Sequence, residues 1–338
     1  MSEKFKADIP SHNPTPPEVF FSRRKFMTTV AKGILLSPAI YLAGGAKDSH
    51  AGLLDEPIKR PDVFPTKRNE TINLPQGLKT DLTPREVAAS HNNFYEFLPG
   101  QGGPVWKYTD KFEVDPWQIE ITGLCSNPMT LDLDDLFKIE HEERLYHFRC
   151  VETWAMNVPW SGFSLNKLIG KAGPKAAAKY VRFISAHKPK QMPGVQQIPA
   201  YPWPYHEALR IDEAMHDLTM AVTGVYGKPL LKQHGAPIRI IVPWKYGYKS
   251  PKSVVKIELV AEQPKIFWGI QPHEYGFLSN VNPNIPHPRW SQETSFWLDT
   301  RETFPTPIFN GYDKYVGKLY PDEPRTPQIP LSEGQIAR

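Results

Sequence analysis

Short stretches of alternating apolar and polar residues predict β-strands in the middle of the chain. A period of two places successive side chains on opposite faces, as in a half-buried strand of a sheet. Residues 143–150 (ERLYHFRC) show this pattern, with Tyr146, Phe148 and Cys150 on one face. The other expected strands cover residues 117–123 (WQIEITG), 179–186 (KYVRFISA), 238–244 (IRIIVPW) and 253–260 (SVVKIELV).

Helices are expected to be few and short. LDLDDLFK (131–138) can begin a helix that is capped by an aspartate. Residues 161–173 contain Leu165, Leu168 and Ile169 at helical spacing, with glycines near the expected end. Residues 206–227 predict a short helix followed by a turn.

Loops are expected to be extensive because the chain is rich in proline. Its 36 prolines in 338 residues are about twice the usual ~5%, and proline interrupts helices and removes a backbone donor. Residues 52–90 are predicted to be extended, and residues 299–338 to wrap the surface. We therefore predict an α+β fold with mixed sheets, short helices and extensive loops.

Residues 22–51 have the pattern of an export signal. Arg23 and Arg24 precede a mildly apolar stretch that Lys32 interrupts, and small residues follow. The segment resembles a twin-arginine signal peptide, which directs export of already folded proteins. The alternative is a chance arginine pair before an ordinary helix. We expect residues 1–51 to be the signal peptide, residues 52–338 a single domain, and the exported protein to lie in the periplasm.

Charge and motifs exclude two classes of ligand. The net charge is +4 and no basic stripe dominates, so a nucleic-acid partner is not indicated. The sequence contains neither GxxxxGK[ST] nor a strand–turn–helix GxGxxG, so a nucleotide-binding loop is not supported.

Cys150 is one of only two cysteines, and three interpretations of it stay open at this point. It can be a buried apolar residue or half of a disulfide with Cys125. It can be a soft thiolate ligand to a metal. It can be a nucleophile with His147 as its base, although an offset of three places the two side chains on opposite faces of a strand.

A zinc site is not supported by the spacing of the histidines. The zincin pattern needs two histidines one helical turn apart, whereas His141 and His147 are six residues apart with Glu142 between them. The sequence also contains no CxxC pair.

Two further groups of polar residues are candidates for binding a ligand. Arg239, Lys249 and Lys252 lie near a glycine turn and suit an anion, the alternative being a solvated basic loop. HNNFYEF supplies Asn92, Tyr95 and Glu96 as hydrogen-bonding groups, although composition alone favours a helix cap there.

Five segments together resemble a known enzyme family. In chain order they are NNFYEF, FRCVETWAMNVPWSGF, HGAPIRIIVPWKYGYKSPKSV, NVNPNIPHPRWSQ and FNGY. They resemble the catalytic subunits of periplasmic protein-methionine-sulfoxide reductases, molybdopterin enzymes of the sulfite oxidase superfamily. The resemblance implies a sulfite-oxidase-like molybdopterin-binding fold and one Mo-molybdopterin per chain.

The resemblance also implies roles for individual residues. Cys150 would be the protein ligand of molybdenum, and Glu152 a candidate relay for protons. His234 and Ser185 are less secure matches, because relatives commonly have asparagine and threonine there. The residues implied to bind the pterin cofactor are Asn92, Tyr95, Glu96, Ser185, His234, Arg239, Lys249, Ser250, Pro251 and Lys252.

The family further implies substrates and an electron donor. The substrates would be oxidised periplasmic proteins, whose methionine sulfoxide is returned to methionine. The chain has no haem motif and no iron–sulfur cysteine pattern. Electrons would therefore come from a haem-containing inner-membrane partner that is linked to quinol.

Two rival functions remain from the sequence. Sulfite oxidation is disfavoured because the residues after Cys150 include Glu152, whose carboxylate would repel a dianion. An exported, metal-free binding protein with a Cys125–Cys150 disulfide is the alternative outside enzymes.

Overall fold

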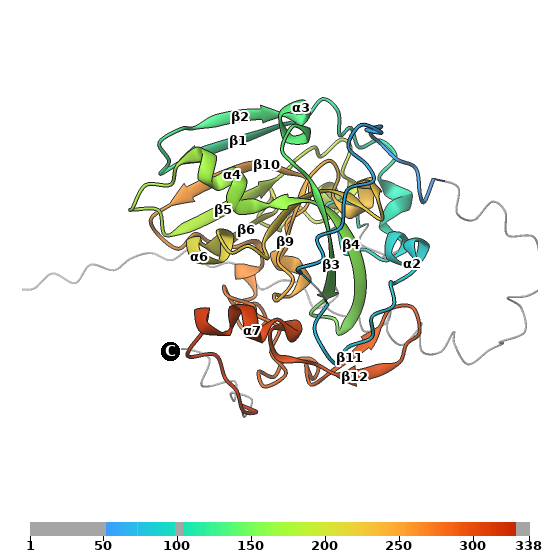
Figure 1. Ribbon diagram of the computed structural model, residues 1–338, viewed down its shortest axis with the longest axis vertical. Coiled ribbons are helices and arrows are strands. Elements are labelled where there is room, and N and C mark those ends of the chain that lie inside the picture. The colour runs from blue at the N-terminus through green and yellow to red at the C-terminus, as the bar shows by residue number, and fades with distance from the viewer. Residues whose placement is uncertain (1–51, 73, 99–103, 329–338) are drawn as a thin grey trace, which may run out of the picture. The chain divides into compact units, whose positions relative to one another are not determined.

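The computed structural model describes residues 52–72, 74–98 and 104–328. The predicted signal peptide, residues 1–51, lies outside these ranges. The predicted mixture of strands and short helices is confirmed, and strands form two mixed sheets (Figure 1). None of the described helices is long and apolar enough to cross a membrane.

The first sheet has five strands in the order β2-β1-β10-β5-β6. β1 is parallel to β10, and the other neighbours are antiparallel. Side chains along β1 and β5 alternate between exposed or partly exposed and buried, which is why their pattern was readable in the sequence. The strands are β1 (Gln118–Gly123), β2 (Met129–Asp132), β5 (Tyr180–Ser185), β6 (His206–Arg210) and β10 (Val254–Val260).

The second sheet is centred on the long strand β4. β4 pairs with β3 over most of its length and with β7 over its last part, while β11 runs parallel beside its start. Figure 1 shows β3 and β4 side by side, ending near β11 and β12. The strands are β3 (Glu142–Arg149), β4 (Trp154–Ser164), β7 (Met220–Val225), β8 (Lys228–Pro229), β9 (Arg239–Ile241), β11 (Thr294–Trp297) and β12 (Thr303–Pro305).

The helices are single turns or little more, and they connect strands. In α3, Asp132 accepts a hydrogen bond from the Asp135 amide at 2.9 Å, which confirms the predicted aspartate cap. The α-helices are α2 (Arg85–Ser90), α3 (Leu133–Phe137), α4 (Leu165–Ala172), α5 (Pro193–Gln197), α6 (Ile211–Ala214) and α7 (Asp313–Val316). The 3₁₀ turns are η1 (Val105–Tyr108), η2 (Lys232–His234), η3 (Gly247–Lys249), η4 (Phe267–Ile270), η5 (Ile308–Gly311) and η6 (Gly317–Leu319).

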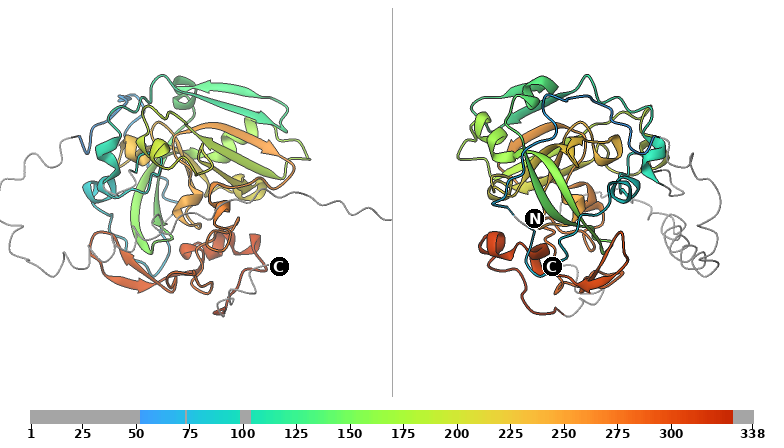
Figure 2. Two further views of the ribbon diagram at one scale, coloured as in Figure 1. Left: turned by 180° about the vertical axis from the view of Figure 1, so that it is seen from behind. Right: turned by 45° about the vertical axis from the view of Figure 1, so that its right-hand side comes forward.

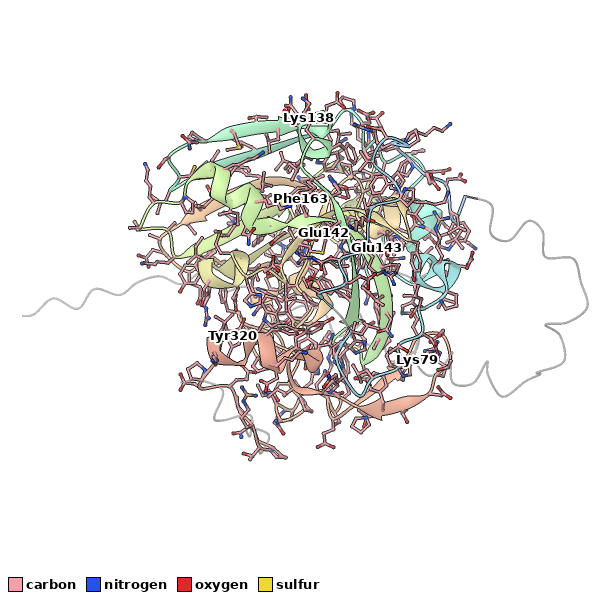
Figure 3. All side chains as sticks on the ribbon, in the orientation of Figure 1. Lys79, Lys138, Glu142, Glu143, Phe163 and Tyr320 are labelled. Carbon is pink, nitrogen blue, oxygen red and sulfur yellow. The ribbon has the colours of Figure 1, made fainter. Side chains whose placement is uncertain are left out.

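The C-terminal residues differ from the prediction that they wrap the surface. Phe309, Tyr312 and Val316 are fully buried, and the Tyr312 hydroxyl accepts a hydrogen bond from the His147 amide at 3.0 Å. Figure 2 shows β11, β12 and α7, coloured red, gathered at one end of the fold. Lys79 reaches this end (Figure 3), where it pairs with Asp299 at 2.9 Å. Part of the C-terminal segment therefore belongs to the core, whereas residues 321–328 are exposed or partly exposed and residues 329–338 lie outside the described ranges.

Candidate active site

A tight loop joins β3 to β4 and carries Cys150 as its first residue. The amide of Cys150 donates to the carbonyl of Trp154 at 3.0 Å, and the amide of Thr153 donates back to the carbonyl of Cys150 at 3.0 Å. Thr153 has a φ of 73°, in the left-handed region that a tight turn often requires. Cys150 therefore lies at the end of a strand, as the alternation of residues 143–150 predicted.

Cys150 lines a cavity that is open to solvent. The cavity walls come from segments far apart in the sequence, namely residues 91–96, the β3–β4 loop and residues 247–252. Nine of the sequence-predicted site residues lie in this lining: Asn92, Tyr95, Glu96, Cys150, Glu152, Arg239, Ser250, Pro251 and Lys252. Their proposed roles in cofactor binding stay predictions.

Asn93, which the sequence analysis passed over, lies closest to the sulfur among the polar side chains of residues 91–96. Its Nδ2 is 3.6 Å from Cys150 Sγ and donates to Glu152 Oε2 at 2.9 Å. The neighbouring Asn92 instead turns its amide back to the carbonyl of Ala89 at 2.8 Å. The Asn-Asn doublet was the only signal in the sequence, and it does not say which asparagine faces the cavity.

Burial governs the chemistry of the Cys150 thiol. Burial first, and then the Glu152 carboxylate, raise the pKa of Cys150 to about 12. The free thiol is thus protonated at neutral pH and lacks the activation that a nucleophile needs. His147 lies on the opposite face, edge-on to the stacked rings of Trp297 and Phe304, so it does not serve as a base for Cys150.

The disulfide alternative is wrong. Cys125 and Cys150 are both free and both buried. Cys125 follows β1 in the first sheet, where its backbone bridges to Pro174. Cys150 borders the cavity at the end of β3 in the second sheet.

Arg239 gives the cavity wall a buried positive charge. Its guanidinium donates to the carbonyls of His234 and Ser250 at 3.0 and 3.1 Å, and its Nε is buried without a partner. Burial lowers the pKa of Arg239 to about 9. In the described part of the chain no carboxylate forms an ion pair with it. A buried cation without a counter-ion is costly, and an anionic ligand would remove that cost.

Lys252 adds a second, partly buried cation to the same wall. Its Nζ donates to the carbonyl of Asn93 at 2.9 Å. Burial lowers the pKa of Lys252 and raises the pKa of Glu96, and their opposite charges limit both shifts. Gly235, with a φ of 99°, makes the packing possible, because a Cβ there would lie 2.6 Å from Cβ of Lys252.

Three predicted site residues lie outside the cavity lining. Lys249 is buried in an ion pair with Glu207 at 2.6 Å and also donates to the carbonyl of Ala208. Ser185 and His234 are buried, and Ser185 Oγ and His234 Nδ1 have no hydrogen-bond partner. Each is one contact from the lining, since the Ser185 amide donates to Tyr205 and the His234 carbonyl accepts from Arg239.

The residues present fit a molybdopterin cofactor. Cys150 offers one soft sulfur, while Arg239 and Lys252 offer positive charge for a phosphate. Among the described residues, no three His, Cys, Asp or Glu side chains gather as a metal-ligand set. A metal at Cys150 would therefore take its remaining ligands from outside the protein, as a dithiolene cofactor provides.

Two residues of the segment NVNPNIPHPRWSQ, to which the sequence assigned no individual role, hold the β3–β4 loop on the side away from the cavity. Trp290 Nε1 and Gln292 Nε2 both donate to the carbonyl of Val151 at 2.8 Å. Gln292 Oε1 also accepts from Arg149 at 2.6 Å. These contacts fix the backbone on either side of the cysteine sulfur.

Aromatic side chains form much of the remaining cavity wall. Trp154, Tyr248, Trp268 and Tyr275 line it together with Met156. Tyr275 lies edge-on to Tyr248 at 5.1 Å and tilted against Trp268 at 4.9 Å between ring centroids. The cavity thus combines a charged wall with an apolar, aromatic one.

Comparison with known proteins gives a domain family and close relatives. Residues 106–268 match the family described as oxidoreductase molybdopterin binding domain, which confirms the predicted molybdopterin-binding fold. The protein-methionine-sulfoxide reductase catalytic subunit MsrP of Xanthomonas axonopodis pv. citri is 41% identical over 328 residues, covering 95% of this chain and 97% of the relative. MsrP of Campylobacter jejuni is 48% identical over 244 residues, covering 72% of this chain and 82% of the relative. The sulfane dehydrogenase SoxCD structure from Paracoccus pantotrophus aligns over 77% of this chain and 66% of its own, with 16% identity and a TM-score of 0.45.

Proposed function

Because this chain belongs to the family of protein-methionine-sulfoxide reductase catalytic subunits, we propose that Cys150 binds the molybdenum of a molybdopterin cofactor and that the enzyme reduces methionine sulfoxide in proteins. The reaction is R₂S=O + 2 H⁺ + 2 e⁻ → R₂S + H₂O. The observation that carries the proposal is that one cavity contains both the free Cys150 thiol and the buried Arg239 guanidinium, which has no carboxylate partner among the described residues.

Cofactor binding divides between two parts of the cavity. Cys150 would hold the metal through its thiolate, and the metal would replace the proton that burial otherwise keeps on the sulfur. Arg239 and Lys252 would hold the phosphate of the pterin by charge-assisted hydrogen bonds. When bound, the cofactor supplies a two-electron couple that can accept an oxygen atom.

The protein side chains near the sulfur would bind and protonate the substrate. Glu152 is held by Asn93 and by Trp154 Nε1, at 2.9 and 3.4 Å, so its carboxylate has a fixed position beside Cys150. A carboxyl group in this position can deliver protons to the departing oxygen. The aromatic wall suits the methionine side chain, because sulfur and aromatic rings attract each other.

Sulfite is the alternative substrate to test. A sulfite dianion would have to approach the Glu152 carboxylate, which disfavours it electrostatically. Sulfite oxidation by the purified protein, at a rate above sulfoxide reduction, would replace the proposal.

The cellular setting forms part of the proposal. The twin-arginine pattern of residues 22–51 supports export of the folded protein to the periplasm. With only two cysteines and no haem motif, the chain needs an electron donor. We propose a haem-containing subunit in the inner membrane that is fed by quinol. Replacing Arg23 and Arg24 by lysine should keep the protein in the cytoplasm, as fractionation would show.

The decisive experiment compares the two cysteines. Cys150→Ser should lose both bound molybdenum and the reduction of oxidised protein by a chemical electron donor. Cys125→Ser is the matched control, because Cys125 is equally buried and free but lies outside the cavity lining. It should keep about one molybdenum per chain and its activity. Retained molybdenum in Cys150→Ser would refute the proposed ligand.

A further inference from the structure

Buried cations of this protein fall into two groups. Lys245 and Lys249 each contact a buried carboxylate, at 2.7 Å from Glu213 and 2.6 Å from Glu207. Arg149 and Arg239 are equally buried, yet neither forms an ion pair with a carboxylate of the described residues. Arg239 faces the cavity where the pterin phosphate is proposed to bind. Arg149 has no such explanation.

Arg149 is bonded only to neutral groups. Its Nε donates to Ser295 Oγ at 2.8 Å, and its Nη1 donates to Gln292 Oε1 at 2.6 Å and to the carbonyl of Cys150 at 3.0 Å. The guanidinium also lies over the ring of Tyr246, 5.4 Å from the centroid. Neutral acceptors satisfy its hydrogen bonds but do not cancel its charge, so its field acts on the adjacent residue.

The neighbour of this charge is the proposed metal ligand. Arg149 immediately precedes Cys150 and points to the opposite side of the strand, away from the cavity. Two opposite charges lie near the sulfur, because the Arg149 guanidinium donates to the Cys150 carbonyl at 3.0 Å and Asn93 links the Glu152 carboxylate to Cys150 Sγ. Burying an uncompensated cation costs several kcal/mol in general, a cost that an electrostatic role would explain.

We infer that Arg149 is a positioning residue for the metal site, whose uncompensated charge, held against the Cys150 carbonyl by Nη1, raises the redox potential of the metal bound to Cys150. The inference rests on the proposed function. Adding electrons makes a metal centre more negative, and a nearby positive charge favours the reduced state. Screening is weak because the guanidinium is fully buried.

A matched pair at Ser295 tests the charge without disturbing the loop. Ser295 is buried in β11, and its Oγ contacts both Arg149 Nε and Thr306 Oγ1. Ser295→Asp would place a carboxylate against the guanidinium. Ser295→Asn has nearly the same shape and accepts the same hydrogen bond, but it is neutral. The two holoenzymes differ by one charge.

The measurement is the midpoint potential of the molybdenum, from a redox titration followed by electron paramagnetic resonance. We expect a lower potential in Ser295→Asp than in Ser295→Asn, with Ser295→Asn close to the unmodified enzyme. Equal potentials in the two variants would overturn the inference.

A second pair applies the same criterion at Arg149 itself, should Ser295→Asp yield no folded holoenzyme. Arg149→Lys and Arg149→Met both lose the guanidinium hydrogen bonds, but only the lysine keeps the charge. The potential should drop in Arg149→Met and be largely retained in Arg149→Lys.

A molybdenum assay of each sample separates the two proposals. Absence of the metal from the unmodified protein refutes the proposed function, whereas bound metal with unchanged potentials refutes only the role of Arg149.

Discussion

Asn93 holds the Glu152 carboxylate beside the Cys150 sulfur, with its Nδ2 2.9 Å from Glu152 Oε2 and 3.6 Å from Cys150 Sγ. One amide therefore contacts both the proposed metal ligand and the proposed proton donor. Residues 91–96 and the β3–β4 loop are distant in sequence, so this contact exists only in the folded chain.

Glu152→Gln should lower the turnover number. The amide keeps the shape and can still hydrogen-bond, but it cannot deliver a proton, and general acids typically contribute 10²–10⁴-fold. We expect a loss of about that size in kcat with little change in KM for oxidised protein. Steady-state kinetics with a chemical donor would measure it. Glu293→Gln, at an exposed position, is the control, and an unchanged kcat in Glu152→Gln would assign proton delivery elsewhere.

Arg239→Met should separate cofactor retention from stability. The buried guanidinium is unpaired in the protein alone, so its removal relieves a desolvation cost. Molybdenum and pterin content should fall several-fold, while the melting temperature of cofactor-free protein should not decrease. Chemical analysis and calorimetry provide the two numbers. Full cofactor content in the variant would show that Arg239 does not bind the phosphate.

Lys249→Met should act through folding instead of through cofactor binding. It would leave Glu207 buried without its cation, which typically costs 3–5 kcal/mol. Adding Glu207→Leu should recover much of that loss. Urea unfolding gives the free energies. The amount of cofactor per folded chain should stay constant. A loss of cofactor without a loss of stability would show instead that Lys249 takes part in cofactor binding.

His147 should make the fold sensitive to acid. Burial lowers its pKa to about 4 from 6.5. Between these pH values only the unfolded chain binds the proton. The contribution of the neutral, buried His147 to the free energy of unfolding is therefore complete above pH 6.5 and is lost as the pH falls towards 4. The loss is about 1.4 kcal/mol per pH unit, roughly 3 kcal/mol in all. Unfolding at several pH values should show a shallower dependence in His147→Gln than in the control His187→Gln, whose side chain is exposed.

Most of the strands that could be predicted have one face that is more exposed than the other. β1, β5 and β10 have that face and were recovered almost to the residue. β3 was also predicted to within one residue although its last four residues are buried, because apolar and polar side chains still alternate along it. β4 was missed because all eleven of its residues are buried, so its sequence does not alternate. Residues 206–227 were predicted to form a short helix and a turn, and α6 is that helix, but the strands β6 and β7 on either side of it were missed. Tertiary pairing with β5 and β4 overrode a weak local preference there.

Site residues could be predicted where the type of side chain suggests a chemical role. They could not be predicted where the packing of the folded chain determines which side chain faces the cavity. Cys150 at a strand end and Arg239 near a glycine turn could be named from residue type and position. Asn93 could not be distinguished from Asn92, because the direction of each amide depends on the loop that contacts it. The ion pair of Lys249 could not be foreseen, because its partner, Glu207, is 42 residues away in the sequence.

The contacts of Trp290 and Gln292 with Val151 indicate that the proposed metal site depends on residues outside the matched domain. The domain match stops at residue 268, yet the side chains that grip the cysteine-bearing turn come more than twenty residues later. A fragment trimmed to residues 106–268 would keep Cys150, Arg239 and Lys252, but it would lose the brace behind the sulfur and also Asn92, Tyr95 and Glu96, which precede the match. The residues proposed to bind the cofactor and the residues that brace the β3–β4 loop therefore come from different parts of the sequence. A protein that receives only the first set should not hold the Cys150 sulfur in the orientation that metal binding needs.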